Sequence, residues 1–203
     1  IEGRCEGRRA GAEASPTPEA AEREAGGRGL KPDMTPVLPL KPAAVLVPIV
    51  ERPEGFTVLF TQRTAHLAHH AGQVSFPGGH IEPDDGGPLE TALRETEEEI
   101  GLDRRHVTVI GHLDTYVTRT GFVVTPVVGL ATPPFTVHPD PREVAEVFEV
   151  PLAFLLDPVN HQRCSAVFEG VERHFYAIPF QQHFIWGATA GMLMDLCRVL
   201  DHA

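Results

Sequence analysis

The segment from Gly86 to Gly101 constrains this chain most strongly, because it carries both the start and the stop signals of one helix. It opens with Gly86-Gly87-Pro88 and closes at Gly101. Proline in the first turn and glycine just past the end are typical of helix boundaries. Apolar or small residues recur every three or four positions between these limits, so we predict a helix over residues 88–100 with one buried face. The predicted buried residues are Leu89, Ala92, Leu93, Thr96 and Ile100.

Four glutamates occupy the last turns of this predicted helix. Glu95, Glu98 and Glu99 are three and four positions apart, so their carboxylates emerge on one helix face. Like charges at this spacing cost roughly 0.2–0.5 kcal/mol per pair, and they lie at the negative end of the helix dipole. One interpretation is a solvated acidic face. The other is a divalent-cation site, because Mg²⁺ and Mn²⁺ prefer carboxylate oxygens, and Arg94 would then orient Glu98.

Apolar stretches on both sides of this helix predict strands, and a second helix follows near the C-terminus. Pro126 indicates that the strand containing it is an edge strand or has a bulge. Strands mixed with two helices favour a single α/β or α+β domain. The predicted strands cover residues 43–50, 56–62, 106–113 and 122–130, and the second helix covers 187–200.

The composition excludes several classes of protein. Seventeen Lys and Arg against 28 Asp and Glu give a net charge of −11, the opposite of a nucleic-acid-binding balance. The longest apolar run, Ala43 to Val47, is far shorter than the ~20 residues of a membrane span. Three cysteines predict neither a disulfide framework nor a zinc half-site, and they fit a reducing compartment. We therefore expect no nucleic-acid partner, no membrane partner and a cytoplasmic location.

The N-terminal segment differs in kind from the rest of the chain. Residues 1–30 are mostly Ala, Gly, Glu and Arg without one aromatic residue, so they have too little apolar surface to fold. We predict a disordered tail over 1–34, or a segment added for expression, because Ile1-Glu2-Gly3-Arg4 resembles a protease recognition site. Met34 would then be the natural start, and the folded domain would cover 35–203.

The residues around the acidic helix resemble the signature of the Nudix hydrolases. The matching positions are Gly79, Asp85, Arg94, Glu95, Thr96, Glu98, Glu99, Gly101 and Leu102. Asp85 stands where the signature has glutamate, eight residues instead of seven separate it from Arg94, and Thr96 replaces a bulky aliphatic residue. The aspartate and the inserted residue are similar to the coenzyme A pyrophosphatase branch of that family.

The upstream motif of that branch also resembles this chain, with every spacing kept. Ala68 replaces the second arginine of the motif, and arginine is the usual bidentate reader of phosphate. His66, His69 and His70 lie nearby, and two interpretations stay open for them: ordinary polar loop residues, or a partial substitute for the lost cation. The matching stretch reads Leu59-Phe60-Thr61-Gln62-Arg63-Thr64, then Ala68, Gly72 and Phe76-Pro77-Gly78-Gly79.

The resemblance implies an α/β (α+β) fold, a Nudix-type α/β/α sandwich with a mixed β-sheet in one domain. It implies cleavage of the diphosphate of coenzyme A or its esters to 3′,5′-ADP and 4′-phosphopantetheine, with Mg²⁺ or Mn²⁺ as cofactor. The partner is a small-molecule nucleotide, and a homodimer stays open. The expected metal ligands are Glu95, Glu98, Glu99 and the Gly79 carbonyl. The expected catalytic residues are Glu98 as base, Glu143 as second candidate base ahead of Glu146, and Arg94; Arg63, Gly78 and Gly79 would bind substrate.

Two alternatives remain at the level of sequence. Ala68 keeps open another nucleoside diphosphate derivative as substrate, such as ADP-ribose or NADH. A non-catalytic domain that senses a nucleotide is the other alternative, although such a domain is expected to lose the carboxylates that this chain retains at Glu95, Glu98 and Glu99.

Overall fold

A computed structural model of the protein describes residues 4–6, 39–67, 71–168 and 171–201. Its main layer is an eight-stranded mixed sheet in which β2 pairs with β8 in parallel and the other pairings are antiparallel. The path runs β4-β3-β2-β8-β6, with β5 on β2, β7 on β8 and β9 on β3. The strands are β2 (Lys41–Arg52), β3 (Gly55–Arg63), β4 (Val74–Ser75), β5 (Gly78–His80), β6 (Val107–His112), β7 (Tyr116–Val117), β8 (Phe122–Ala131) and β9 (Val144–Pro151).

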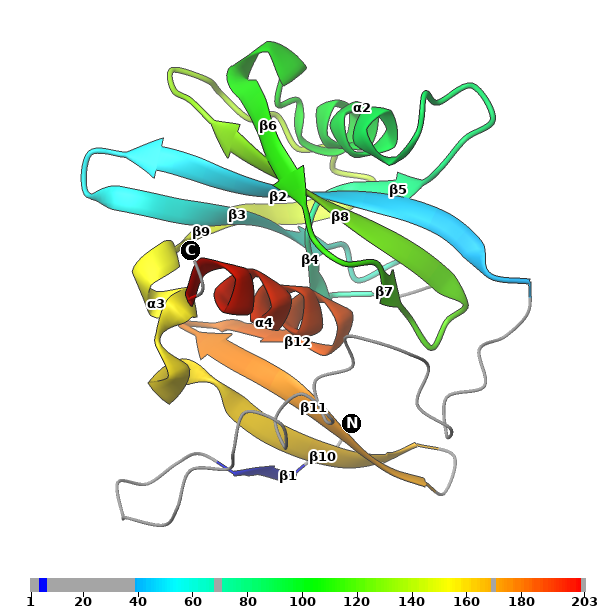
Figure 1. The fold of residues 1–203 in the computed structure, drawn as a ribbon, viewed down its shortest axis with the longest axis vertical. Helices are drawn as coiled ribbons and strands as arrows, with labels where there is room; N and C mark the ends of the chain where they lie inside the picture. Colours follow the sequence, from blue (N-terminus) through cyan, green and yellow to red (C-terminus); the bar gives the residue numbers. More distant parts are fainter. Residues whose placement is uncertain (1–3, 7–38, 68–70, 169–170, 202–203) are drawn as a thin grey trace.

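A smaller antiparallel sheet and the helices complete the fold. The order of strands in the small sheet is β1-β10-β11-β12. Helix α2 covers one face of the large sheet, whereas α4 lies against the other face, between the two sheets (Figure 1). The remaining elements are β1 (Arg4–Glu6), α2 (Pro88–Ile100), η1 (Arg104–His106), α3 (Leu152–Leu156), η2 (Pro158–Asn160), β10 (Gln162–Phe168), β11 (Val171–Phe180), β12 (His183–Trp186) and α4 (Gly187–Asp201).

The core lies on both faces of the large sheet, which explains the uninterrupted apolar run in β2. Alternate residues of β2 pack toward α2 and toward α4, as in a strand that is buried on both sides. Leu46 faces Ala92 of α2, while Val47 belongs to the cluster that contains Leu193 of α4 and Phe60 of β3. This arrangement confirms the predicted α/β/α sandwich with a mixed sheet.

The predicted helices and strands lie where the structure has them. Two details were wrong: the place of Pro126 in the sheet and one of the residues expected on the buried face of α2. Pro126 lies in a central strand between β2 and β6. Thr125 and Pro126 fall between the segments that pair with β6 and β7, and the carbonyl of Pro126 accepts a hydrogen bond from the N–H of Leu113 at 2.9 Å. Leu89 is 47% exposed, whereas Thr91 is buried in the first turn of α2.

The cysteine prediction was also wrong, and the tail prediction falls mostly outside the described residues. Cys164 is disulfide-bonded, and the residue opposite to it in the β1–β10 register is Cys5. Arg4–Glu6 form strand β1, which differs from the absence of structure predicted for these three positions. The rest of 1–34, apart from these residues, lies outside the described part of the chain. None of the described helices is long and apolar enough to cross a membrane.

Candidate active site

The backbone of β5 lies directly against the carboxylates of α2. A Cβ atom added to Gly79 would lie 2.5 Å from the Cδ atom of Glu95, so a side chain there would force this carboxylate to move. Gly78 has a φ of 152° and would collide with the backbone of β2 if it carried a side chain. Its N–H donates to Oε2 of Glu99 at 3.2 Å. The approach of β5 to β2 therefore requires glycine at position 78, and glycine at position 79 leaves the Glu95 carboxylate in its place beside β5.

Glu99 is the most buried carboxylate of the group, with 5% of the residue exposed. Desolvation raises its pKa to about 7, against the opposing effects of the Gly78 N–H and of the Arg63 guanidinium. Nη1 of Arg63 lies 3.7 Å from Oε1 of Glu99. Nε of Arg63 is buried and has no hydrogen-bond partner among the described residues. The structure thus brings Arg63, Gly78 and Glu99 together, with one buried donor left to satisfy.

The raised pKa of Glu99 makes a prediction for the metal-free protein. The folded state binds the proton of the Glu99 carboxyl group more tightly than the unfolded chain does. The stabilisation that this protonated carboxyl group contributes is therefore complete below about pH 4.5 and is lost as the pH rises through about 7. We expect Glu99 to lower the free energy of unfolding by on the order of 2–3 kcal/mol between pH 5 and pH 8. Chemical denaturation in the presence of a chelator, with wild type and Glu99→Gln side by side, measures this. A difference between the two proteins that does not change with pH would contradict the burial of Glu99.

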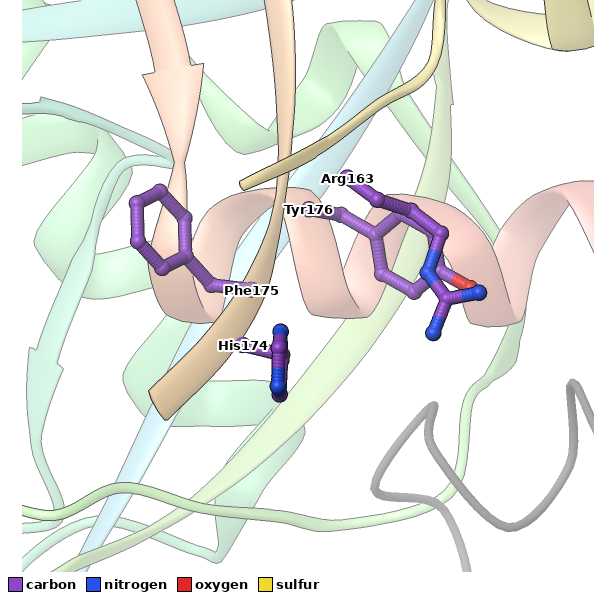
Figure 2. A pocket seen from close by; sticks show the side chains of 4 residues that line it. All are labelled: Arg163, His174, Phe175 and Tyr176. Atoms are coloured by element: carbon purple, nitrogen blue, oxygen red, sulfur yellow. The ribbon is translucent and has the colours of Figure 1, made fainter. Parts of the chain in front are cut away.

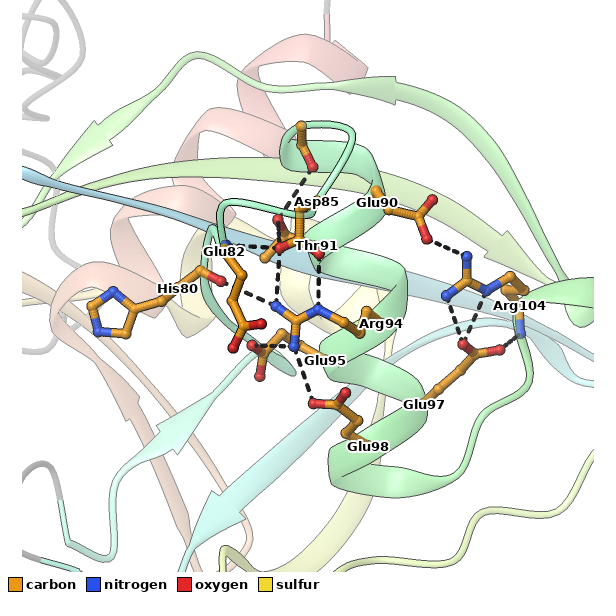
Figure 3. Close-up of polar contacts among 11 residues, drawn as sticks. His80, Glu82, Asp85, Glu90, Thr91, Arg94, Glu95, Glu97, Glu98 and Arg104 are labelled. Atoms are coloured by element: carbon orange, nitrogen blue, oxygen red, sulfur yellow. Dashed lines mark hydrogen bonds and ion pairs between the residues drawn. The ribbon is translucent and has the colours of Figure 1, made fainter.

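Arg94 organises the exposed half of the carboxylate group (Figure 3). Its Nε and Nη2 atoms donate to the two oxygens of Asp85 at 2.9 and 3.0 Å. Its Nη1 atom lies 2.9 Å from Glu95 and 3.1 Å from Glu98. The predicted contact between Arg94 and Glu98 is present, and Arg94 holds Glu95 as well. Glu98 keeps 60% of its side chain exposed, so it faces solvent from this arrangement.

Asp85 is a partner of Arg94 and not a free member of the acidic group. Besides the two bonds from Arg94, it accepts hydrogen bonds from the hydroxyl of Thr91 at 2.7 Å and from the N–H of Glu82 at 2.9 Å. The Arg94 guanidinium holds the pKa of Asp85 well below its usual range. Asp85 therefore closes the loop before α2 and fixes the arginine that aligns Glu95 and Glu98.

Glu143 joins the carboxylate group from a different part of the chain. Its carbonyl accepts a hydrogen bond from the N–H of Thr64 at 2.9 Å, just beyond the end of β3. Burial raises the pKa of Glu95 and Glu99, and the charge of Glu143 adds to the increase in both. Glu146 instead lies 3.1 Å from Nε2 of the buried His183 of β12. The structure thus brings Glu143, and not Glu146, to the site.

The donor set suits a hard divalent cation. Glu95, Glu98, Glu99 and Glu143 offer carboxylate oxygens, and burial together with like charge disfavours the ionised forms of Glu95 and Glu99. A divalent ion would reverse both penalties. Among the described residues, no three Asp, Glu, His or Cys side chains form a ready metal cluster as they stand. Binding of a cation would therefore require these carboxylates to move closer together.

A second, separate hollow lies on the small sheet (Figure 2). Its lining residues are Arg163 of β10 and His174, Phe175 and Tyr176 of β11. It contains none of the α2 carboxylates. Phe175 also contacts Trp186 of β12, with 5.4 Å between the ring centroids, so this aromatic pair belongs to the packing of the small sheet.

Comparison with known proteins gives a consistent result. Residues 40–167 match the family model of the NUDIX domain. The chain is 42% identical over 156 residues to a Photorhabdus laumondii protein described as an uncharacterized Nudix hydrolase, NudL, covering 77% of this chain and 83% of that one. For NudL of Yersinia enterocolitica the identity is 44% over 159 residues, covering 78% and 81%. In fold, the chain is similar to the crystal structure of a Nudix hydrolase from M. smegmatis, RenU, with a TM-score of 0.56 and 22% identity over 80% of this chain and 86% of that one.

Proposed function

Because this chain belongs to the Nudix hydrolases, enzymes that act on pyrophosphate bonds, we propose that it cleaves the diphosphate of coenzyme A or its esters in a reaction that depends on Mg²⁺ or Mn²⁺. The products are 3′,5′-ADP and 4′-phosphopantetheine. The observation that carries this proposal is the approach of the β5 backbone and of Arg63 to the buried carboxylate of Glu99. A cation and exposed backbone beside clustered carboxylates are what a metal-bound polyanion requires. The motif around Arg63 supports coenzyme A as the substrate.

The proposed metal ligands are Glu95, Glu98, Glu99 and the carbonyl of Gly79. When bound, divalent ions supply Lewis-acid chemistry, because they neutralise charge on the diphosphate oxygens and lower the pKa of water. Glu99, which is buried and hydrogen-bonded to backbone, is suited to hold a cation. Gly78 and Gly79 let the backbone turn beside the phosphates.

Glu98 is the proposed base. Its carboxylate is largely exposed and held on one side by Arg94, so an oxygen of Glu98 can accept the proton of an attacking water. Water then adds to phosphorus as the bond to the bridging oxygen breaks. Glu143 is the second candidate for this role, because its carboxylate lies near enough to Glu95 and Glu99 for its charge to act on both.

Arg63 is proposed to bind the diphosphate end of the substrate, because it lies beside Glu99. We expect Arg63→Ala to lower kcat/KM by roughly 10–100-fold, the value of a charge-assisted contact, and to do so equally for coenzyme A and for 3′-dephospho-coenzyme A. Steady-state kinetics on both substrates measures this, with Arg63→Lys as the variant that keeps the charge. A larger loss for coenzyme A would show that Arg63 reads the 3′-phosphate instead.

Ala68 favours one second candidate, a Nudix hydrolase for ADP-ribose or NADH, because the coenzyme A motif has arginine at this position. Ala68 itself lies outside the described residues.

A cytoplasmic location is part of the proposal. The disulfide at Cys164 does not support this location, because disulfides are rare in reducing compartments.

A further inference from the structure

The loop that precedes β9 carries an arginine at the rim of the proposed site. The side chain of Arg142 is 87% exposed. Two of its nitrogens, Nε and Nη2, are aligned by the carboxylate of Asp140 at 3.0 and 2.6 Å. This fork of contacts restricts the guanidinium, so less entropy is lost when it binds an anion.

The backbone around Arg142 is tied to the site from both sides. Its carbonyl accepts hydrogen bonds from the hydroxyl of Thr64 at 3.3 Å and from Nε2 of His66 at 3.2 Å. The N–H of Asp140 donates to the carbonyl of Glu99 at 2.9 Å. Arg142 is therefore positioned by the loop that follows Arg63 and by the C-terminal end of α2.

The cations inside the site are already committed to carboxylates. Arg94 is shared by Asp85, Glu95 and Glu98, and Arg63 faces Glu99. Arg142 is also paired with a carboxylate, that of Asp140, but this pair lies at the rim with 87% of the arginine side chain exposed, and the charge of Arg142 interacts with that of the adjacent Glu143. A phosphate outside the metal-bound diphosphate needs a cation of its own, since the protein carries a net charge of −11.

We propose that Arg142, aligned by Asp140, binds the phosphate monoester on the ribose of the substrate and so determines specificity for the 3′-phosphorylated nucleotide. This inference rests on the proposed function and adds to it the residue that selects the substrate. The sequence motif gives no indication of it, because Arg142 lies far outside the motif in the chain.

The chain offers a matched control for this arginine. Arg105 is also exposed, at 76%, and is held by Asp103 two residues earlier, with its N–H on Oδ1 and its Nε on Oδ2 at 3.1 Å. Asp140 makes the same backbone contact to Arg142. Arg105 precedes β6, at the opposite side of the large sheet from β9. Arg105→Ala thus removes an equivalent surface pair without touching the proposed site.

The first arm of the test is kinetic. We expect Arg142→Ala to lower kcat/KM for coenzyme A about 10-fold more than kcat/KM for 3′-dephospho-coenzyme A, mainly through KM, with Arg142→Lys intermediate and Arg105→Ala unchanged. Equal losses on the two substrates would overturn the inference while leaving the proposed function standing. Thermal unfolding of both alanine variants checks that each is folded.

The second arm does not depend on hydrolysis. Calorimetric titration of the full chain with 3′,5′-ADP and with AMP, in the presence of Mg²⁺, should show tighter binding of 3′,5′-ADP by wild type, and this preference should disappear in Arg142→Ala. No preference in wild type, or the same preference in the variant, would overturn the inference. A preference that depends on Arg142 in a protein that does not cleave coenzyme A would sustain the inference and reject the proposed function.

Discussion

Replacing Glu98 by glutamine is expected to lower kcat by about 10²–10⁴-fold, the contribution of a general base, while leaving the fold unchanged. Glutamine keeps an acceptor for the bond from Nη1 of Arg94, which lies 3.1 Å from the carboxylate in the native protein. It cannot take up a proton from water. Because 60% of the Glu98 side chain is exposed, the substitution creates no buried defect. Steady-state kinetics with Mg²⁺ measures the loss of kcat, and thermal unfolding shows whether the fold is unchanged.

Glu97 provides the control for this experiment. It is the adjacent residue on α2, but its carboxylate binds Arg104, on a different side of the helix from Arg94 (Figure 3). We expect Glu97→Gln to retain activity, with a small loss of stability because an ion pair is weakened. Full activity of Glu98→Gln would reject Glu98 as the base and would turn attention to Glu143.

The second large effect is expected from Gly79→Ala, with a loss of kcat/KM of about 10²-fold. The added methyl group would lie 2.5 Å from the carboxylate of Glu95, so this carboxylate must move away from β5. A displacement of about 1 Å at a catalytic group costs on the order of 10²-fold. The apparent affinity for Mn²⁺, followed by titration calorimetry, should fall with the activity.

Gly86→Ala is the matched control, because Gly86 lies in the loop just before α2. A Cβ there meets nothing nearer than Cβ of Glu90 at 3.9 Å. We therefore expect this variant to keep both its activity and its affinity for Mn²⁺. Normal metal affinity in Gly79→Ala would show that the position of Glu95 does not matter for cation binding.

The sequence predicted the acidic helix well because the signals for it are local. Proline at the start, glycine at Gly101 and the spacing of the glutamates together define where α2 runs and which residues share a face. The ends of β2, β3, β6 and β8 were predicted within a few residues for a similar reason, since a continuous or alternating apolar pattern belongs to one segment. The small sheet had no such pattern, because polar and aromatic residues alternate irregularly through β10 and β11.

Apart from the contact between Arg94 and Glu98, which lie one turn apart on α2, the partners of the site residues depend on tertiary contacts and could not be predicted from local patterns. The local pattern does not indicate that Asp85 would bind Arg94 or that Glu146 would turn to His183. Glu143 was expected near the site, ahead of Glu146, only because of the family resemblance. The exposure of Leu89 has the same origin. The helical period predicts a row of buried residues along one face of α2. In the first turn, however, the loop before α2 covers Thr91, and the Thr91 hydroxyl donates a hydrogen bond to Asp85 in that loop.

The most direct test of the central claim is hydrolysis of coenzyme A, ADP-ribose and NADH at equal concentration, with Mg²⁺ and then Mn²⁺, and products identified by mass. The Glu98→Gln protein is run in parallel. We expect 3′,5′-ADP and 4′-phosphopantetheine to appear with wild type and metal, at a higher rate than any product of the other two substrates, and to be nearly absent with the variant. Preferential cleavage of ADP-ribose or NADH, or no cleavage of coenzyme A by the wild-type enzyme with either metal, would contradict the proposed substrate.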